Sequence, residues 1–176
     1  MAKRNIIILK LLPNESYCLS HSLQEGKVSY LYVHGDWNPE DWKEVHKGSE
    51  FFLIQNMDGF PGISMQGTIN SDAQVFGSFP GIEKGIVGTH LLANLYVDID
   101  KYRLLSTSTL QAMMPDFDWD SPFSGHPLPK QYAIKLHQIW YEYLAMNDNF
   151  IDNQSAPFEC IPDDKKCNKD IVLINC

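Results

Sequence analysis

The distribution of apolar and polar positions predicts a chain made mainly of short β-strands, followed by one long helix. Asn5–Leu12 is an almost unbroken run of β-branched residues and leucine, ended by Pro13, and predicts a buried strand. Turn residues at 56–61 predict a hairpin loop, and Gly67 is typical of a bulge or a close backbone approach. Further strands are predicted at Val28–Val33, Glu50–Gln55, Gly62–Asn70 and Leu95–Asp100.

The long helix is amphipathic. Apolar residues recur at spacings of three and four over Tyr132–Leu144, which predicts a helix that begins near Pro129 and ends at Asn147. Its apolar stripe would pack against the sheet. A shorter helix is predicted after Asn38, which can cap it, with Gly48 as its end.

The length of 176 residues fits one α+β domain. We expect this domain to extend over residues 1–146, with 147–176 as a polar C-terminal extension that holds a short strand. No run approaches the roughly 20 apolar residues of a membrane-spanning helix. The first apolar run is short and interrupted by Lys10, so it does not indicate a signal peptide. A cytoplasmic protein without a membrane partner is therefore expected.

The net charge and the motifs of the sequence limit which ligands and reactions we expect for this protein. The net charge of −8 argues against a broad phosphate-binding face, because such faces are basic. The four cysteines and six histidines show no metal-ligand spacing, so neither a metal nor another cofactor is expected. Nucleophile-elbow, P-loop and dinucleotide motifs are missing from the sequence, which favours a protein that is not an enzyme.

Three groups of residues carry a resemblance to a known family. The first is Lys47–Ile54 followed by Pro61–Ile69, the second is the strand around Tyr96–Ile99, and the third is Trp119 followed by Ser124-Gly125 and a helix with Trp140. In this order the segments resemble EVE-like domains of the PUA-like superfamily, which stand alone or precede HNH endonuclease domains in modification-dependent restriction systems. The resemblance implies a twisted, partly closed β-barrel with flanking helices.

The resemblance also implies a pocket for a base turned out of its stack. Such a pocket needs aromatic faces and a few polar groups aimed at the base edges. Trp37 and Trp119 both lie in polar loops, where aromatic side chains often serve binding. The candidate ligand-binding residues are Trp37, Trp119, Ser124, Gly125, Asp36 and Phe52.

Each candidate also has a structural interpretation. The indoles of Trp37 and Trp119 could pack in the core, and Ser124-Gly125 could form only a turn ahead of the last helix. Asp36 could accept hydrogen bonds from an exocyclic amine or simply stabilise a turn. Phe51 and Phe52 point to opposite faces of one strand, so one of the two belongs to the core.

Three functional hypotheses remain open at this point. The first is a non-catalytic module that recognises a modified or flipped nucleobase in an aromatic pocket, in DNA rather than RNA. The second is an acidic protein-interaction module, such as an immunity or accessory protein, with a basic protein partner. The third is a small hydrolase that uses the same cleft, with Asp36 or a nearby histidine as general base.

Overall fold

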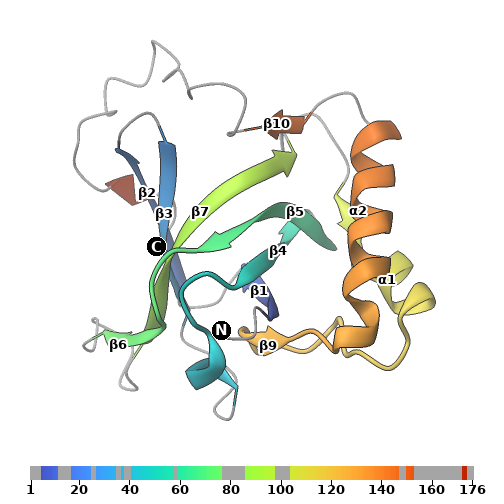
Figure 1. Ribbon diagram of the computed structural model, residues 1–176, viewed down its shortest axis with the longest axis horizontal. Helices are drawn as coiled ribbons and strands as arrows, with labels where there is room; N and C mark the ends of the chain where they lie inside the picture. Colours follow the sequence, from blue (N-terminus) through green and yellow to red (C-terminus); the bar gives the residue numbers. More distant parts are fainter. Residues whose placement is uncertain are drawn as a thin grey trace.

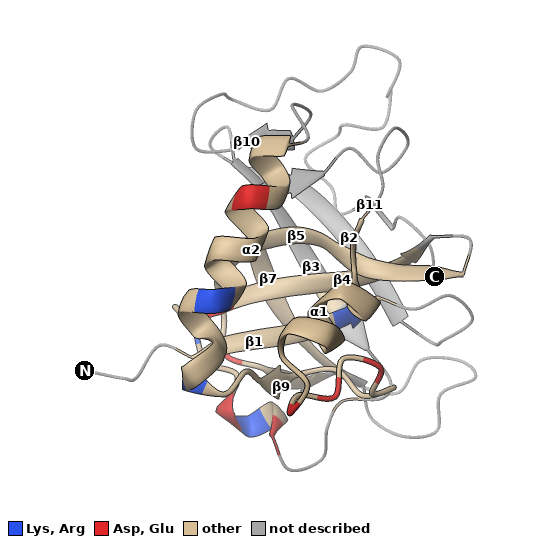
Figure 2. Ribbon diagram, turned by 90° about the vertical axis from the view of Figure 1, so that its right-hand side faces the viewer, with Lys and Arg blue, Asp and Glu red and all other residues tan. Residues whose placement is uncertain are grey.

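The computed structural model describes residues 5–11, 17–24, 27–34, 37, 41–57, 59–76, 86–97, 104–146, 150–152 and 172–173. Within these residues, eleven strands form one mixed sheet that curls into a half-barrel, with two α-helices on one side (Figure 1). Figure 2 shows the two helices together against the same face. The α+β class predicted from the sequence is confirmed.

The elements follow one another in the order of their numbers. The first strands are β1 (Ile6–Leu11), β2 (Tyr17–Gln24), β3 (Lys27–His34), β4 (Glu50–Met57), β5 (Phe60–Ile69) and β6 (Gln74–Phe76). The later strands are β7 (Ile86–Val97), β8 (Leu105–Ser106), β9 (His126–Pro127), β10 (Phe150–Asp152) and β11 (Val172–Leu173). The helices are α1 (Thr107–Met113) and α2 (Ala133–Met146), with 3-10 turns η1 (Trp42–Glu44) and η2 (Lys130–Tyr132).

The main path through the sheet runs β11-β2-β3-β7-β5-β4-β1-β9. Strand β1 lies parallel to β4, with Ile6 opposite Glu50 and Leu11 opposite Gln55, and antiparallel to β9. Side chains alternate across a strand, so β1 supplies apolar residues to both of its faces. This explains why its sequence is apolar almost throughout.

Two hydrophobic clusters fill the two faces. The helix-side cluster lies between the sheet and the helices and contains Ile6, Ile8, Phe52, Ile54, Ile63, Leu105, Leu110, Met114, Phe117, Trp119, Leu128, Leu136, Ile139, Trp140 and Leu144. The barrel-side cluster lies on the concave face and contains Ile7, Leu9, Tyr32, Trp37, Val45, Phe51, Leu53, Met65, Ile69, Val87, Leu91 and Ala93. Phe52 therefore belongs to the core on the helix side.

The predicted strands at 28–33, 50–55 and 62–70 are found as β3, β4 and β5 with small shifts of their bounds. Of the predicted strand Leu95–Asp100, only residues 95–97 belong to β7, which begins at Ile86, and residues 98–100 lie outside the described residues. The apolar stripe of the long helix is confirmed by α2, whose buried residues are Leu136, Ile139, Trp140 and Leu144. At Gly67 the pairing of β5 with β7 shifts register, and an added Cβ would meet the backbone of Leu92 and Ala93. The predicted close approach at this glycine is confirmed.

Other elements differ from the prediction. The short helix expected after Asn38 appears only as the 3-10 turn η1, and residues 38–40 lie outside the described residues. The helix α1 was not predicted. In the described ranges, no helix has both the length and the apolar character needed to cross a membrane.

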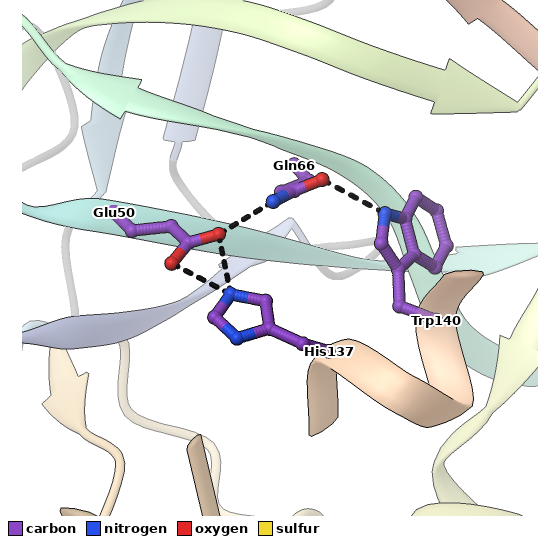
Figure 3. A network of polar contacts seen from close by, with 4 residues as sticks. All are labelled: Glu50, Gln66, His137 and Trp140. Atoms are coloured by element: carbon purple, nitrogen blue, oxygen red, sulfur yellow. Dashed lines mark hydrogen bonds and ion pairs between the residues drawn. The ribbon is translucent and has the colours of Figure 1, made fainter. Parts of the chain in front are cut away.

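A polar network attaches α2 to the sheet. His137 Nε2 lies 2.9 and 2.8 Å from the two carboxylate oxygens of Glu50 on β4. Glu50 also accepts from Gln66 Nε2 at 2.5 Å, and the Gln66 oxygen accepts from Trp140 Nε1 at 3.0 Å (Figure 3). Because a carboxylate only accepts, His137 Nε2 carries the proton. The network fixes the helix in register with β4 and β5.

Candidate functional site

The structure brings Trp37 into contact with Ser124 and Gly125. Trp37 forms an isolated parallel bridge with Ser124. Its indole Nε1 donates to the carbonyl of Val87, and its ring lies edge-on to that of Tyr32, with centroids 5.7 Å apart. Gly125 has a φ of 86°, and a Cβ added there would lie 2.5 Å from Trp37 Cε3. Only glycine allows the chain to pass this close to the ring.

The hydroxyl of Ser124 is buried in a closed set of hydrogen bonds. It accepts from the backbone N–H of Lys10 at 3.1 Å and lies 2.7 Å from the Tyr32 hydroxyl. Tyr32 donates its own proton to the carbonyl of Lys10. Ser124 therefore donates to the Tyr32 oxygen. Ser124 positions the segment that carries Gly125, whose N–H donates to Ile8.

Lys10 is a buried cation that sequence reasoning did not select as a site residue. It is 2% exposed, and its Nζ donates to the carbonyls of Trp119 at 2.6 Å and Ser121 at 2.5 Å. These bonds join β1 to the loop before β9. The signal in the sequence is a single charged residue inside an otherwise apolar strand, since buried lysines need partners.

The two loop indoles do not share one pocket in the described structure. Trp37 belongs to the barrel-side cluster and Trp119 to the helix-side cluster, so their rings lie on opposite faces of the sheet. Both are buried, at 5% and 1% exposure. Trp119 Nε1 donates to the carbonyl of Met114 at 3.2 Å, and its ring packs edge-on against Phe117. The packing interpretation therefore describes Trp119.

The two remaining candidate ligand-binding residues are Phe52 and Asp36. Phe52 is fully buried, with its ring edge-on to Trp140 at 6.0 Å between centroids, so it lines the core rather than a pocket. The physical reason is strand alternation, which turns Phe52 toward α2 while Phe51 faces the barrel side. Asp36 lies outside the described residues.

A second polar arrangement joins Ser121, His126 and Asp41. Ser121 Oγ lies 3.1 Å from His126 Nε2, and His126 Nδ1 lies 3.2 Å from Asp41 Oδ2. Ser121 Oγ also accepts from the N–H of Phe123 at 3.2 Å. Because Asp41 only accepts, Nδ1 carries a proton, and in the neutral ring Nε2 then accepts from the serine hydroxyl. Ser121, His126 and Asp41 are thus arranged as a nucleophile, a general base and a carboxylate that orients the base, and His126 has the tautomer that this arrangement needs.

Access to this arrangement comes from the side of the imidazole. The side chains of His126 and Asp41 are 23% and 33% exposed, whereas Ser121 is 5% exposed. Sequence reasoning expected Asp36 or a nearby histidine as a base and did not select this set. The short spacing from Ser121 to His126 was visible, but the contact with Asp41 spans 85 positions and depends on the fold.

The loop that carries Ser121 is rich in acidic side chains. Asp116, Asp118 and Asp120 are all exposed in the segment that follows α1, and acidic residues colour this segment in Figure 2.

Tyr132 donates to Asp116 Oδ2 at 2.7 Å, and this hydrogen bond raises the pKa of the Tyr132 hydroxyl. Burial raises the pKa of Tyr143. Both hydroxyls therefore stay neutral near pH 7, and neither supplies a base.

The described residues contain no group of three or more His, Cys, Asp or Glu side chains that could hold a metal ion. Comparisons with protein families, with curated proteins and with solved structures give no match for this chain.

Proposed function

We propose that the protein is a PUA-like, EVE-type binding module for a modified or flipped nucleobase, in DNA rather than RNA, that does no chemistry on the base. One observation carries this proposal. Trp37 and the pair Ser124-Gly125, more than eighty positions apart in the sequence, are in contact. The resemblance implies a base pocket, and these are the candidates that meet in space. A module of this kind would act in the cytoplasm.

In this proposal Trp37 supplies the stacking face. Asp36, its neighbour in the sequence, supplies an acceptor for an exocyclic amine. Trp119 and Phe52 take no part, because both pack on the helix side. Since Trp37 is 5% exposed, the base reaches the ring only when neighbouring residues move aside. We therefore expect association to be slower than for a preformed site.

Replacing Trp37 by leucine should weaken binding to a duplex that carries one 5-methylcytosine by roughly tenfold or more, because stacking of a base on an aromatic ring contributes about 1–3 kcal/mol. Fluorescence anisotropy with matched methylated and unmodified duplexes measures this. Trp42→Leu is the control, since Trp42 also packs against the barrel-side cluster, whereas the ring next to Gly125 is that of Trp37.

Circular dichroism establishes that both variants are folded. Binding should also depend weakly on salt, because the acidic chain makes few phosphate contacts. Wild-type protein that binds neither duplex, or binds both equally across a panel of modifications, contradicts the proposal.

A second candidate function is the hydrolysis of a small carboxylic ester at Ser121, favoured by the order Ser121, His126, Asp41. Ser121 Oγ would attack the carbonyl carbon as its proton passes to His126 Nε2. The bond to the leaving alcohol then breaks, and the alcohol takes that proton. Water, deprotonated in turn by His126, releases the acid and restores the serine.

A fluorophosphonate probe separates the two candidates, because it labels only an activated serine. If Ser121 is a nucleophile, the wild-type protein is labelled and both Ser121→Ala and His126→Ala lose the label. Ser108→Ala, at an exposed serine of α1, keeps it. Wild-type protein that stays unlabelled, or label that persists in Ser121→Ala, rules out this second function and leaves the polar set a structural role.

A further inference from the structure

Exposed apolar side chains gather on the two helices. Of the seven large apolar residues that are exposed within the described part of the chain, four lie on α1 and α2: Met113, Ile134, Tyr141 and Met146. Ile134 and Tyr141 on α2 are 74% and 50% exposed. Apolar area left in water is unfavourable, and exposed apolar side chains that lie together are typical of an interaction surface.

These two residues belong to a stripe on the outer side of α2. Ile134 and Tyr141 are seven positions apart, about two helical turns, so they share one face of the helix. The buried residues Leu136 and Trp140 face the sheet instead, and Figure 2 shows the outer side of α2 with the sheet behind it. Gln138 lies between Ile134 and Tyr141 on the same side. These three exposed residues are called the outer stripe.

The ring of Tyr141 is held in place from within the molecule. It stacks on the His137 imidazole, with 6.3 Å between the ring centroids and 23° between the ring planes. His137 is itself bonded to Glu50 on β4. An aromatic side chain whose orientation is already fixed loses little conformational freedom on binding, so the outer stripe is preorganised for a partner.

The charges beside the outer stripe fit a second copy of this chain. Lys135 and Glu142 are the only Lys, Arg, Asp or Glu residues of α2, and each directly follows an apolar residue of the stripe. Two α2 helices that pack antiparallel about a two-fold axis beside Gln138 place Ile134 across from Tyr141 of the second copy. The same axis places Lys135 across from Glu142 of the second copy, because both pairs are centred close to position 138. Each contact occurs twice, and Gln138 meets its own copy, whose amide both donates and accepts.

The distribution of charge favours the same partner. The whole chain carries a net charge of −8, so two copies repel each other over most of their surfaces. Along α2, however, the charges of Lys135 and Glu142 cancel. A strongly basic or acidic partner therefore finds no matching field on this face, whereas a second copy meets two pairs of opposite charges.

We propose that the outer stripe is the interface of a symmetric homodimer in which two α2 helices pack antiparallel. The proposal goes beyond the base site and does not depend on it. Lys135 Nζ carries three protons, so it reaches Glu142 of the second copy while it keeps its hydrogen bond to the carbonyl of Met113.

Ile134→Ala tests the apolar part of this interface. Sedimentation equilibrium of the wild-type protein, over concentrations from about 1 µM to about 1 mM, should show a monomer–dimer equilibrium. Ile134→Ala should weaken the dimer by roughly tenfold or more, because each dimer loses two buried side chains. Phe60→Ala is the matched control, since Phe60 is 76% exposed but lies at the start of β5.

An exchange of charges tests the antiparallel arrangement. Lys135→Glu and Glu142→Lys should each weaken the dimer by roughly five- to tenfold, because each places two pairs of like charges across the interface. A mixture of the two variants should associate about as tightly as the wild type, since every pair in the mixed dimer is again opposite in charge. Lys47→Glu, at an exposed lysine before β4, makes the same change of net charge and should leave the dimer intact.

Three results overturn the proposal. Wild-type protein that stays a monomer up to the highest concentration shows that the outer stripe does not bind a second copy. A dimer that Ile134→Ala leaves intact uses another surface. A mixture of the two charge variants that associates no better than either variant alone contradicts the antiparallel pairing.

Discussion

Replacing Lys10 by methionine should lower the free energy of unfolding by about 2–4 kcal/mol, because two buried backbone carbonyls lose a donor. The methionine side chain fills most of the volume but donates no hydrogen bond. The carbonyls of Trp119 and Ser121 then stay buried without the ammonium that now satisfies them. Removing a buried charge together with its partners can be neutral, but the carbonyls of Trp119 and Ser121 are main-chain groups and remain.

Lys135 provides a matched control for this variant. Its Nζ donates to the carbonyl of Met113 at 2.6 Å, the same type of hydrogen bond, but on an exposed surface where water replaces the donor. Lys135→Met should therefore change stability by less than about 0.5 kcal/mol. Urea denaturation of both variants measures the difference. If Lys10→Met unfolds at the same urea concentration as the wild type, the ammonium does not hold the loop to β1.

The position of Lys10 shows how far the sequence alone could predict the site. The apolar run around it predicts a buried strand, and β1 confirms this. A lysine within such a run also indicates that a partner exists. Its acceptors, however, lie 109 and 111 positions away in a loop, and no local pattern connects them. Local periodicity predicts which face is buried but not which segment covers it.

The same limit explains the different outcomes for the two indoles. Trp37 and Gly125 meet in the fold, although only Gly125 belongs to a segment that carries the resemblance. The ring of Trp119 turns to the helix side because its loop follows α1, an element that was not predicted. The sequence of α1, TSTLQAM, contains only one buried apolar residue, Leu110. A segment this short shows no repeat of apolar residues at spacings of three or four, so the pattern could not predict the helix. The hydroxyl of Ser106 caps this helix.

Gly125→Ala should lower the free energy of unfolding by about 3 kcal/mol and displace the indole of Trp37. Two effects add. A φ of 86° is strained for any residue with a Cβ, by roughly 1–2 kcal/mol. The new methyl group would also lie 2.5 Å from Trp37 Cε3 and 2.7 Å from Cζ3, closer than carbon atoms approach. The indole has little freedom to yield, because Nε1 is bonded to Val87 and Tyr32 packs against the ring.

Gly59→Ala separates the two effects. Gly59 has almost the same φ, 87°, but nothing lies within 4 Å of an added Cβ, so this variant carries the backbone strain alone. The difference between the two variants measures the contact with Trp37, and near-UV circular dichroism should change only for Gly125→Ala. In a Trp37→Ala background, Gly125→Ala should cost no more than Gly59→Ala. An equal cost of Gly125→Ala with and without the indole would show that Trp37 does not pack on this glycine in solution, and the site built on that contact would be lost.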